Sequence, residues 1–414
     1  MPRCSARLFK GMSQAIRYYD IGVNLTDPMY QGIYNGKKYH ECDIQSVLHR
    51  AKLARVENML LTGSSIQESR QAIEIAGRYH SEDTHLYYTL GVHPCCVNEF
   101  VLKDSQSTID APTNDEKFNA SLEVTDVAFT KRKLEELYRL MEGQACDPQF
   151  RAVGEIGLDY DRLYYSSKKM QLLFFEEQLK ISCLFPEKPL FLHMRNCCSD
   201  FEAVLKKFID GFTDSTDRFD HKRLIRASQS TPYMPRIESS GGVWYKFSEG
   251  RKFVTHSFTG STEEMHRVLA LSDNSFIGMN GCSFKTQENI DCVREIPLDR
   301  LLLETDAPWC DIRRTHDSYK FLYDDVSSCH TAKDDPWDNG LSKAYPDIQK
   351  WFRGVKRDKV DKNPAGERDG IVVKSRNEPC FMGHVAMVVA KVKALPAEEV
   401  ISQVWRTSCE IYGD

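Results

Sequence analysis

The sequence predicts an α/β protein, most simply a (β/α)8 TIM barrel, and two observations support this prediction. First, eight short apolar runs recur along the 414 residues, at 17–25, 57–64, 86–94, 150–158, 188–195, 251–258, 275–281 and 300–308. Second, segments with apolar residues three and four positions apart alternate with these runs, as amphipathic helices do. Strands that alternate with helices form a parallel sheet, and eight such units close most simply into a barrel.

The individual elements follow from their residue patterns. Near-continuous apolar runs such as ENMLLTGS are typical of strands that are covered on both faces. The helical spacing predicts helices over 44–56, 65–80, 127–143, 170–185, 201–212, 263–272, 380–394 and 398–412. Ser261 followed by Glu264 predicts a capping box at the start of one of them. The alternative is an open doubly wound sheet, which normally has a Gly-rich turn after its first strand, and DIGVNLTD is not such a turn.

The domain prediction is a flexible tail at 1–16 followed by one barrel domain at 17–414. Three polar segments break the alternation, at 101–124, 213–250 and 317–370, and we interpret them as surface insertions. The second of them reads as a long loop. The third carries basic residues beside Trp351 and Phe352, a combination that can contact a nucleic acid strand, although nearby acids favour a solvated loop.

Composition narrows the class of protein. A hydrophobic content of 41%, a mean hydropathy of -0.48 and no membrane-length apolar run predict a soluble protein without membrane partners. The fourteen cysteines contain no CxxC spacing, so we expect reduced thiols and no disulfide-linked partner. We expect a cytoplasmic or nuclear monomer, and the basic N-terminus leaves a mitochondrial location open. The net charge of -5 excludes a global attraction to nucleic acid.

Polar side chains stand at the ends of seven of the eight predicted strands. They are Asp20 and Asn24, His93, Glu155 and Asp159, His193 and Arg195, His256, Asn280, and Asp306. In a barrel these ends meet at one face, where barrel enzymes carry out their chemistry. Taken singly, each has a simpler explanation, such as a hydrogen-bonded core histidine or a turn-capping aspartate. Together, imidazoles and carboxylates on neighbouring strands have the composition of a metal site.

The motifs that carry these residues resemble those of one family. DIGVNLTD, GVHP, GEIGLDYDR, HMR, HSFTGS, ETDAPW and RNEP are similar, in order, to motifs of the TatD family of metal-dependent deoxyribonucleases. The likeness runs from Tyr19 to about Gly413 and implies a barrel of the metal-dependent hydrolase (amidohydrolase-like) type. It implies metal ligands at Glu155, His193, His256 and Asp306, with Glu155 bridging. His93 falls where the family has a further site histidine, so His93, Glu155 and Asp306 are the expected catalytic residues.

One departure from the family pattern affects the expected metal. Many members have a His-x-His pair at the positions held here by Gly22 and Asn24, although the DIGVNL branch of the family shares this feature. We expect Asn24 as an additional oxygen ligand, with Asp20 as a further contributor. Fewer nitrogens shift the preference toward one or two Mg²⁺ ions, with Mn²⁺ or Zn²⁺ as alternatives.

The resemblance implies hydrolysis of DNA phosphodiesters, 3′ to 5′ and on single strands. Asp306 is the expected base, and His93 or Arg195 would stabilise the developing charge. Expected phosphate contacts are Arg162, Arg195, Arg376 and Lys285. For Arg376 a structural ion pair is an equal alternative. Two other functions stay open, hydrolysis of another ester such as an aminoacyl-tRNA bond, and a non-catalytic scaffold.

Overall fold

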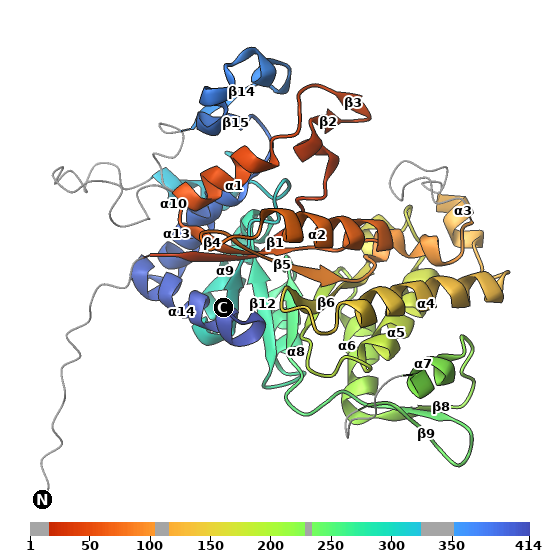
Figure 1. Cartoon of the computed structure of the whole chain (residues 1–414). Coiled ribbons are helices and arrows are strands. Elements are labelled where there is room, and N and C mark those ends of the chain that lie inside the picture. Colours follow the sequence, from red (N-terminus) through yellow and green to blue (C-terminus); the bar gives the residue numbers. More distant parts are fainter. Residues whose placement is uncertain (1–15, 104–115, 228–233, 324–351) are drawn as a thin grey trace, which may run out of the picture.

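The computed structural model describes residues 16–103, 116–227, 234–323 and 352–414. Its main sheet has eight parallel strands that pair in chain order (Figure 1). They are β1 (Tyr18–Val23), β4 (Val56–Leu61), β5 (His85–Leu90), β6 (Phe150–Asp159), β7 (Leu190–Arg195), β11 (Phe253–His256), β12 (Ser275–Met279) and β13 (Leu301–Leu303). A parallel bridge between Val23 and Ala307 joins the last strand region to the first. The predicted barrel is therefore confirmed.

Helices cover the outside of the barrel. They are α1 (Ile44–Leu53), α2 (Ile66–Tyr79), α4 (Val127–Gly143), α5 (Lys168–Ser182), α6 (Cys198–Asp210), α8 (Thr262–Leu269), α9 (Gln287–Glu295), α13 (Met382–Lys393) and α14 (Ala397–Tyr412). All eight predicted helices are present, and α9 was not predicted. Ser261 and Glu264 form the predicted capping box, which satisfies two backbone N–H groups at the start of α8.

The barrel interior is closed at its amino-terminal end. Alternate strand residues such as Tyr19, Ile21 and Phe191 point inward and pack in one apolar cluster with three residues of α14. The Tyr19 ring lies 6.1 Å from the rings of both Trp405 and Tyr412. Helix α14 therefore plugs the bottom of the barrel, and the carboxyl ends of the strands are left as the open face.

Several strands are shorter than predicted at the end that bears the polar residues. The third ends at Leu90 rather than at 94, and the eighth at Leu303 rather than at 308. His93 instead starts the 3-10 helix η2 (Pro94–Phe100), and Asp306 has a left-handed backbone with φ +52°. The helix that begins after His93 and the left-handed backbone of Asp306 end the two strands, so these two side chains lie on loops above the sheet.

The second insertion differs from the predicted long loop. It holds α7 (His221–Ala227) and a three-stranded antiparallel sheet, ordered β8 (Phe212–Asp214), β10 (Val243–Tyr245), β9 (Arg236–Ile237). A buried ion cluster anchors it to α5, where Lys180 contacts Glu177 and Asp214 at 2.8 Å each. These contacts give the segment a fixed position that its polar composition did not reveal.

The first and third insertions, like the second, are described only in part. The first contains α3 (Glu116–Ser121). The third contains α10 (Lys320–Tyr323) and the 3-10 helices η7 (Asp317–Tyr319), η8 (Arg357–Lys362) and η9 (Ala365–Gly370), with β14 (Arg353–Val355) parallel to β15 (Ile371–Val373). Trp351 lies outside the described residues. Phe352 is 4% exposed and packs on Ala54, Val372 and Cys380, so it does not stand free at the surface as the sequence suggested.

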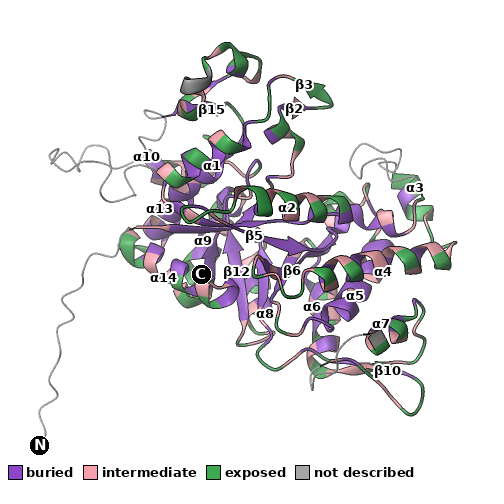
Figure 2. Cartoon of the chain, in the orientation of Figure 1, coloured by how far each residue is buried: buried purple, intermediate pink, exposed green. Residues whose placement is uncertain are grey.

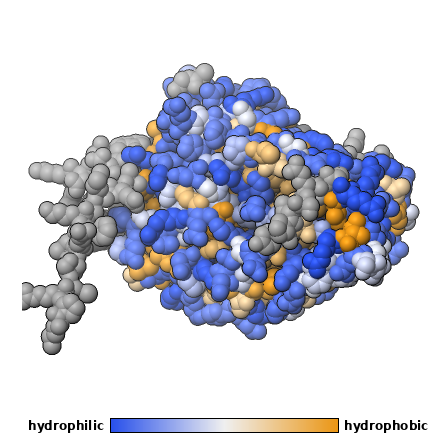
Figure 3. Space-filling view, turned by 60° about the horizontal axis from the view of Figure 1, so that its bottom comes forward, coloured by the Kyte–Doolittle hydropathy of each residue, from blue (hydrophilic) through white to orange (hydrophobic). Residues whose placement is uncertain are grey.

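The remaining elements are short: the hairpin β2 (Ile33–Tyr34) and β3 (Lys37–Lys38), and the 3-10 helices η1 (Pro28–Gln31), η4 (Tyr160–Arg162), η5 (Gly281–Phe284), η6 (Leu298–Arg300) and η10 (Pro379–Phe381). The strands are buried while the outer helix faces are exposed (Figure 2). Where hydrophobic side chains reach the surface shown in Figure 3, they form small separate patches.

The described residues contain twelve cysteines, and none forms a disulfide. Among these residues no single helix is long and apolar enough to cross a membrane. Residues Pro379–Lys393 and Ala397–Tyr412 reach that length and composition only together, with a bend of 114° between them.

Candidate active site

Neighbouring strands bring three polar side chains to one point of the open face. Glu155 lies in β6, His193 in β7 and His256 at the end of β11. In the register of the parallel sheet, His193 pairs directly with His256, so both side chains leave the sheet at the same level. His93, from the loop after β5, completes the group from the other side of Glu155.

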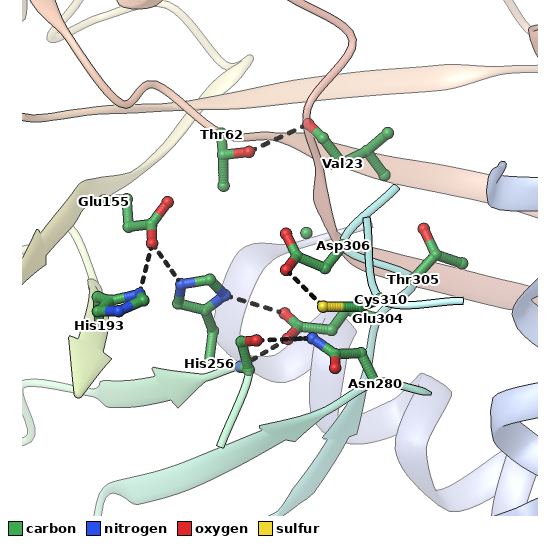
Figure 4. Close-up of polar contacts among 12 residues, drawn as sticks. Val23, Thr62, Glu155, His193, His256, Asn280, Glu304, Thr305, Asp306 and Cys310 are labelled. Atoms are coloured by element: carbon green, nitrogen blue, oxygen red, sulfur yellow. Dashed lines mark hydrogen bonds and ion pairs between the residues drawn. The ribbon is translucent and has the colours of Figure 1, made fainter. Parts of the chain in front are cut away.

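The group is centred on one oxygen of Glu155. Its Oε1 lies 2.9 Å from His193 Nδ1 and 2.8 Å from His256 Nε2 (Figure 4). The same oxygen lies 3.4 Å from His93 Nε2. Burial would raise the pKa of this carboxyl, but His256, His93 and His193 hold it well below its usual value. Glu155 is therefore a buried anion surrounded by imidazole nitrogens.

Each of the two predicted histidine ligands is also held from behind by a second carboxylate. His193 Nε2 lies 3.2 Å from Asp159 Oδ2, and His256 Nδ1 lies 3.4 Å from Glu304 Oε2. The other oxygen of Glu304 accepts hydrogen bonds from Ser257 N (2.6 Å) and Asn280 Nδ2 (3.0 Å). Metal-binding histidines commonly donate their second N–H to such a carboxylate, which fixes the ring orientation.

His93 has a different role in this group. Its Nδ1 accepts a hydrogen bond from the backbone N–H of Cys95 at 3.1 Å, so in the neutral ring the proton is on Nε2. Burial lowers the pKa of His93 to about 3, which keeps the ring neutral. His93 thus presents a neutral N–H donor to the centre of the site. This arrangement suits hydrogen bonding to an oxyanion better than binding of a metal through Nε2.

Asp306 faces the site from the loop after β13. Its Oδ1 accepts a hydrogen bond from Asn24 Nδ2 at 2.9 Å, and its Oδ2 accepts one from the Cys310 thiol at 3.2 Å. Burial and the charge of Glu304 raise the pKa of Asp306 to about 6. A carboxylate with a pKa in this range can take a proton near neutral pH.

Asn24 and Asp20, the expected oxygen ligands, are both engaged in hydrogen bonds around the Asp306 loop. The amide oxygen of Asn24 accepts a hydrogen bond from Thr62 Oγ1 at 2.5 Å and its amide nitrogen donates to Asp306, so Asn24 orients Asp306. Asp20 is fully buried, and it accepts hydrogen bonds from the backbone N–H of Thr305 (2.8 Å) and from its hydroxyl (2.5 Å). Both side chains therefore fix the loop that carries Asp306.

Gly22 has a steric reason for lacking a side chain. A Cβ at this position would lie 2.7 Å from Glu304 Oε2, closer than real Cβ contacts. A histidine at position 22, as in many members with the His-x-His pair, would therefore require the Glu304 carboxylate to move. The glycine at position 22 therefore leaves the space in which the Glu304 carboxylate contacts His256.

The charge balance and donor atoms of the site fit a divalent cation. Four carboxylates, from Glu155, Asp159, Glu304 and Asp306, surround the histidines. Ligand atoms of Glu155, His193 and His256 lie within 4.8 Å of one another. Imidazole with carboxylate is a donor set used for Zn²⁺ and other divalent ions. His93, Asp159 and His193 form a second such group, but the Cys95 bond to His93 Nδ1 disfavours it as a metal site.

Three of the predicted phosphate contacts lie at the surface. The Arg162 side chain is 45% exposed and its Nε lies 3.8 Å from Asp159 Oδ2. The Arg195 side chain is 35% exposed and bonds Asp161 at 2.7 Å. Lys285 is exposed and directly follows η5. All three are accessible cations at or just beyond the carboxyl ends of barrel strands: Arg162 in η4 after β6, Arg195 at the end of β7 and Lys285 after η5.

Arg376 is not available to a phosphate, and its prediction as a substrate contact is corrected. Its side chain is 0% exposed and makes a two-pronged ion pair with Asp43, at 2.8 and 2.6 Å. The same guanidinium lies 2.8 Å from Glu378, which also pairs with Arg50. The structural ion pair, the alternative named from the sequence, is the arrangement found.

Sequence reasoning missed Glu304, Cys310 and Trp309 and gave Asp159 no role. Glu304 had a detectable signal, because a carboxylate directly after the apolar run LLL belongs to a buried strand end. Trp309 is 49% exposed beside Asp306, whose backbone oxygen accepts its N–H at 2.9 Å. No local pattern identified the thiol contact of Cys310, which depends on how the loop turns.

The barrel and its site thus define the metal-dependent hydrolase type of (β/α)8 enzyme. The model of the family described as TatD related DNase matches residues 19–413. Deoxyribonuclease Tat-D of Saccharomyces cerevisiae is 48% identical over 415 residues, covering 96% of this chain and 92% of its own length. The chain therefore belongs to the TatD-related DNase family and is a hydrolase of the deoxyribonuclease type.

Two further comparisons extend this assignment. The 3′-5′ ssDNA/RNA exonuclease TatD of Erwinia tasmaniensis is 30% identical over 294 residues, covering 70% of this chain and 80% of its own. A crystal structure of an uncharacterized amidohydrolase from Saccharomyces cerevisiae is 46% identical with a TM-score of 0.80. It covers 96% of this chain and 100% of the crystallised one, which places the fold in the amidohydrolase-like group.

Proposed function

We propose that this deoxyribonuclease is a metal-dependent exonuclease that removes nucleotides from the 3′ end of single-stranded or frayed DNA. The observation that carries the proposal is the convergence of His93, His193 and His256 on Glu155 Oε1, with Asp306 on the neighbouring loop. The 3′-to-5′ direction and the single-stranded preference are inferred from the name of the bacterial relative.

The side chains divide the work of phosphodiester hydrolysis among them. A divalent ion held by Glu155, His193, His256 and Asp306 would supply Lewis acidity and a water of lowered pKa. Asp306, which faces the same point from the loop after β13, accepts the proton of the attacking water. The Nε2–H of His93 donates to a non-bridging phosphate oxygen and stabilises charge as the bond to the leaving oxygen breaks.

The surface arginines complete the proposed substrate site. Arg162 lies in η4 directly after β6 and Arg195 is the last residue of β7, and both side chains are partly exposed. Planar guanidinium groups suit bidentate contact with phosphates on either side of the scissile bond. Lys285 is a weaker contact of the same kind. Mg²⁺ is the ion we propose, and the two imidazoles make Mn²⁺ and Zn²⁺ the necessary comparisons.

Cleavage of oligonucleotides tests the proposal. Purified protein is incubated with end-labelled single-stranded, 3′-recessed and 5′-recessed DNA, with Mg²⁺, Mn²⁺, Zn²⁺ or chelator. We expect a metal-dependent ladder that shortens from the 3′ end and is absent with Glu155→Ala. Glu82→Ala, which removes an exposed carboxylate outside the site, should cleave as the parent does.

Three results would overturn parts of the proposal. Cleavage of circular single-stranded DNA at the linear rate would exclude the exonuclease mode. A ladder from the 5′ end would reverse the direction. Folded protein that cleaves no DNA with any metal would point to another ester, such as an aminoacyl-tRNA bond, or to a scaffold.

A further inference from the structure

A cavity of about 440 Å³ lies beside the loop that carries Asp306. Three parts of the chain enclose it: residues 310–312 after Asp306, residues of 352–377 in and around β14 and β15, and residues 381–385 at the start of α13. Its volume is in the range of roughly 300–1,000 Å³ that is usual for small-molecule pockets. The proposed catalytic steps make no use of it, and no relative's name assigns it a ligand.

The cavity and the active site share one wall. Cys310 lines the cavity, and its sulfur lies 3.2 Å from Asp306 Oδ2. Asn377, a second lining residue, fixes the same loop through hydrogen bonds to the backbone oxygens of Thr305 (2.9 Å) and Trp309 (2.7 Å). A group that enters the cavity would therefore lie one side chain away from the metal-ligand loop.

The lining combines apolar walls with one unpaired cation. Phe352, Phe381 and Val385 supply aromatic and aliphatic surface, with Phe352 and Val385 each 4% exposed. Lys374 lines the cavity, is exposed, and has no ion pair with a described residue. Apolar walls can pack against the face of a flat ring, and an unpaired ammonium group can bind a phosphate.

We propose that this cavity binds the base of a nucleotide next to the scissile phosphate, with Lys374 at the adjoining backbone phosphate. The inference rests on the proposed nuclease function and names a substrate subsite for it. A buried apolar side chain of a partner protein would also suit the walls, but would leave the lysine and the shared wall with Asp306 without a role. Binding through ring faces is sequence-tolerant, so all four bases should be accepted.

Gly354 offers a way to fill the cavity without disturbing the site. It lines the cavity, and a Cβ there would meet only Lys374 carbons at 3.4 Å, an ordinary contact. Gly354→Trp therefore places a ring into the space meant for the base. Gly77→Trp is the matched control, because nothing lies within 4 Å of a Cβ at Gly77 and that residue is exposed on α2.

The test compares single-stranded oligonucleotides that are intact or carry one abasic residue at the first, second or third position from either end. We expect the parent to cleave the intact strand with a kcat/KM about tenfold higher than that of one abasic strand, the size of a lost base stack. Gly354→Trp should lower the intact rate to the abasic rate and leave the abasic rate unchanged. Gly77→Trp should retain the parent's preference, and Lys374→Ala should raise KM for both strands.

The subsite would be overturned if the parent cleaved intact and abasic strands at equal rates for every abasic position. It would also be overturned if Gly354→Trp lowered the cleavage rates of both strands by the same factor. A binding assay separates this failure from failure of the nuclease function. The fluorescence of 2-aminopurine deoxynucleoside 5′-monophosphate should be quenched by the parent and not by Gly354→Trp. Quenching without cleavage of any DNA would keep the cavity and reject the nuclease, whereas cleavage without quenching would reject the cavity.

Discussion

Two of the buried clusters of charged side chains in this protein differ in how their charge is balanced. In the first, the active-site cluster, the carboxylates Glu155, Asp159, Glu304 and Asp306 surround His93, His193 and His256. In the second, the ion-pair cluster, Arg50 and Arg376 bind Asp43 and Glu378. Burial would raise the pKa of Glu378, but the two guanidinium groups hold it below its usual value.

The difference shows which kind of buried charge indicates a function. Two guanidinium groups and two carboxylates neutralise one another, so the ion-pair cluster needs nothing further. The active-site carboxylates are balanced differently, because Arg162 is the one arginine or lysine in an ion pair with any of them among the described residues. Burial would lower the pKa of His193 and of His256, but the neighbouring carboxylates raise both, so these anions draw protons onto the imidazoles or a bound cation in their place. The two clusters should therefore respond in opposite ways to substitution.

The largest expected effect is on metal binding in the active-site cluster. Glu155→Gln removes the central anion and should weaken Mn²⁺ binding by more than about 100-fold. This exceeds the loss of about 10–100-fold that is usual when a residue supporting a metal ligand is changed. Its free energy of unfolding without metal should change little, because one unbalanced charge is lost. Calorimetric titration with Mn²⁺ and urea unfolding measure the two quantities. A large loss of metal-free stability would show that the cluster holds the fold together without a cation.

The opposite pattern is expected for the ion-pair cluster. Arg376→Ala leaves Asp43 and Glu378 buried with one partner fewer and should lower the free energy of unfolding by about 3–5 kcal/mol. Mn²⁺ affinity measured at a temperature where the variant is folded should match that of the parent. A loss of DNA cleavage of more than tenfold in fully folded variant protein would return Arg376 to the substrate site.

The same comparison explains what the sequence could predict. The eight strands were recognisable because runs such as LLTG and LLLE are apolar on both faces, and a parallel barrel requires this. His193 and His256 could be placed together because strand ends meet at one face. The partner of Arg376 could not be predicted, since Asp43 is 333 residues away. The hydrogen bond between Asn24 and Thr62 could not be predicted either, because it depends on how β1 and β4 pair.

A smaller effect is expected behind the ligands, where Glu304 supports His256. In Glu304→Gln the amide oxygen can still accept the hydrogen bonds from Ser257 and Asn280, but the negative charge that orients the His256 imidazole is lost. We expect Mn²⁺ affinity to fall by about 10–100-fold. Asp159→Asn should act similarly through His193, and Glu295→Gln, which changes an exposed carboxylate paired with His266, is the control. Unchanged affinity in both variants would mean that the strands alone fix the two rings.

The smallest effect is expected at Trp309, which joins the two clusters through its backbone. Its N–H donates to Asp306 O at 2.9 Å, and its carbonyl accepts from Asn377, the residue between Arg376 and Glu378. The side chain itself is 49% exposed, so it is free to stack on a base near the scissile bond.

Trp309→Ala leaves the backbone bonds and should raise KM for single-stranded DNA about fivefold, near 1 kcal/mol, with kcat unchanged. Phe118→Ala, which removes a 40% exposed ring on α3, should leave KM unchanged. If kcat falls and KM stays constant in Trp309→Ala, the ring acts by positioning Asp306, and the loop that joins the two clusters is then part of the catalytic site.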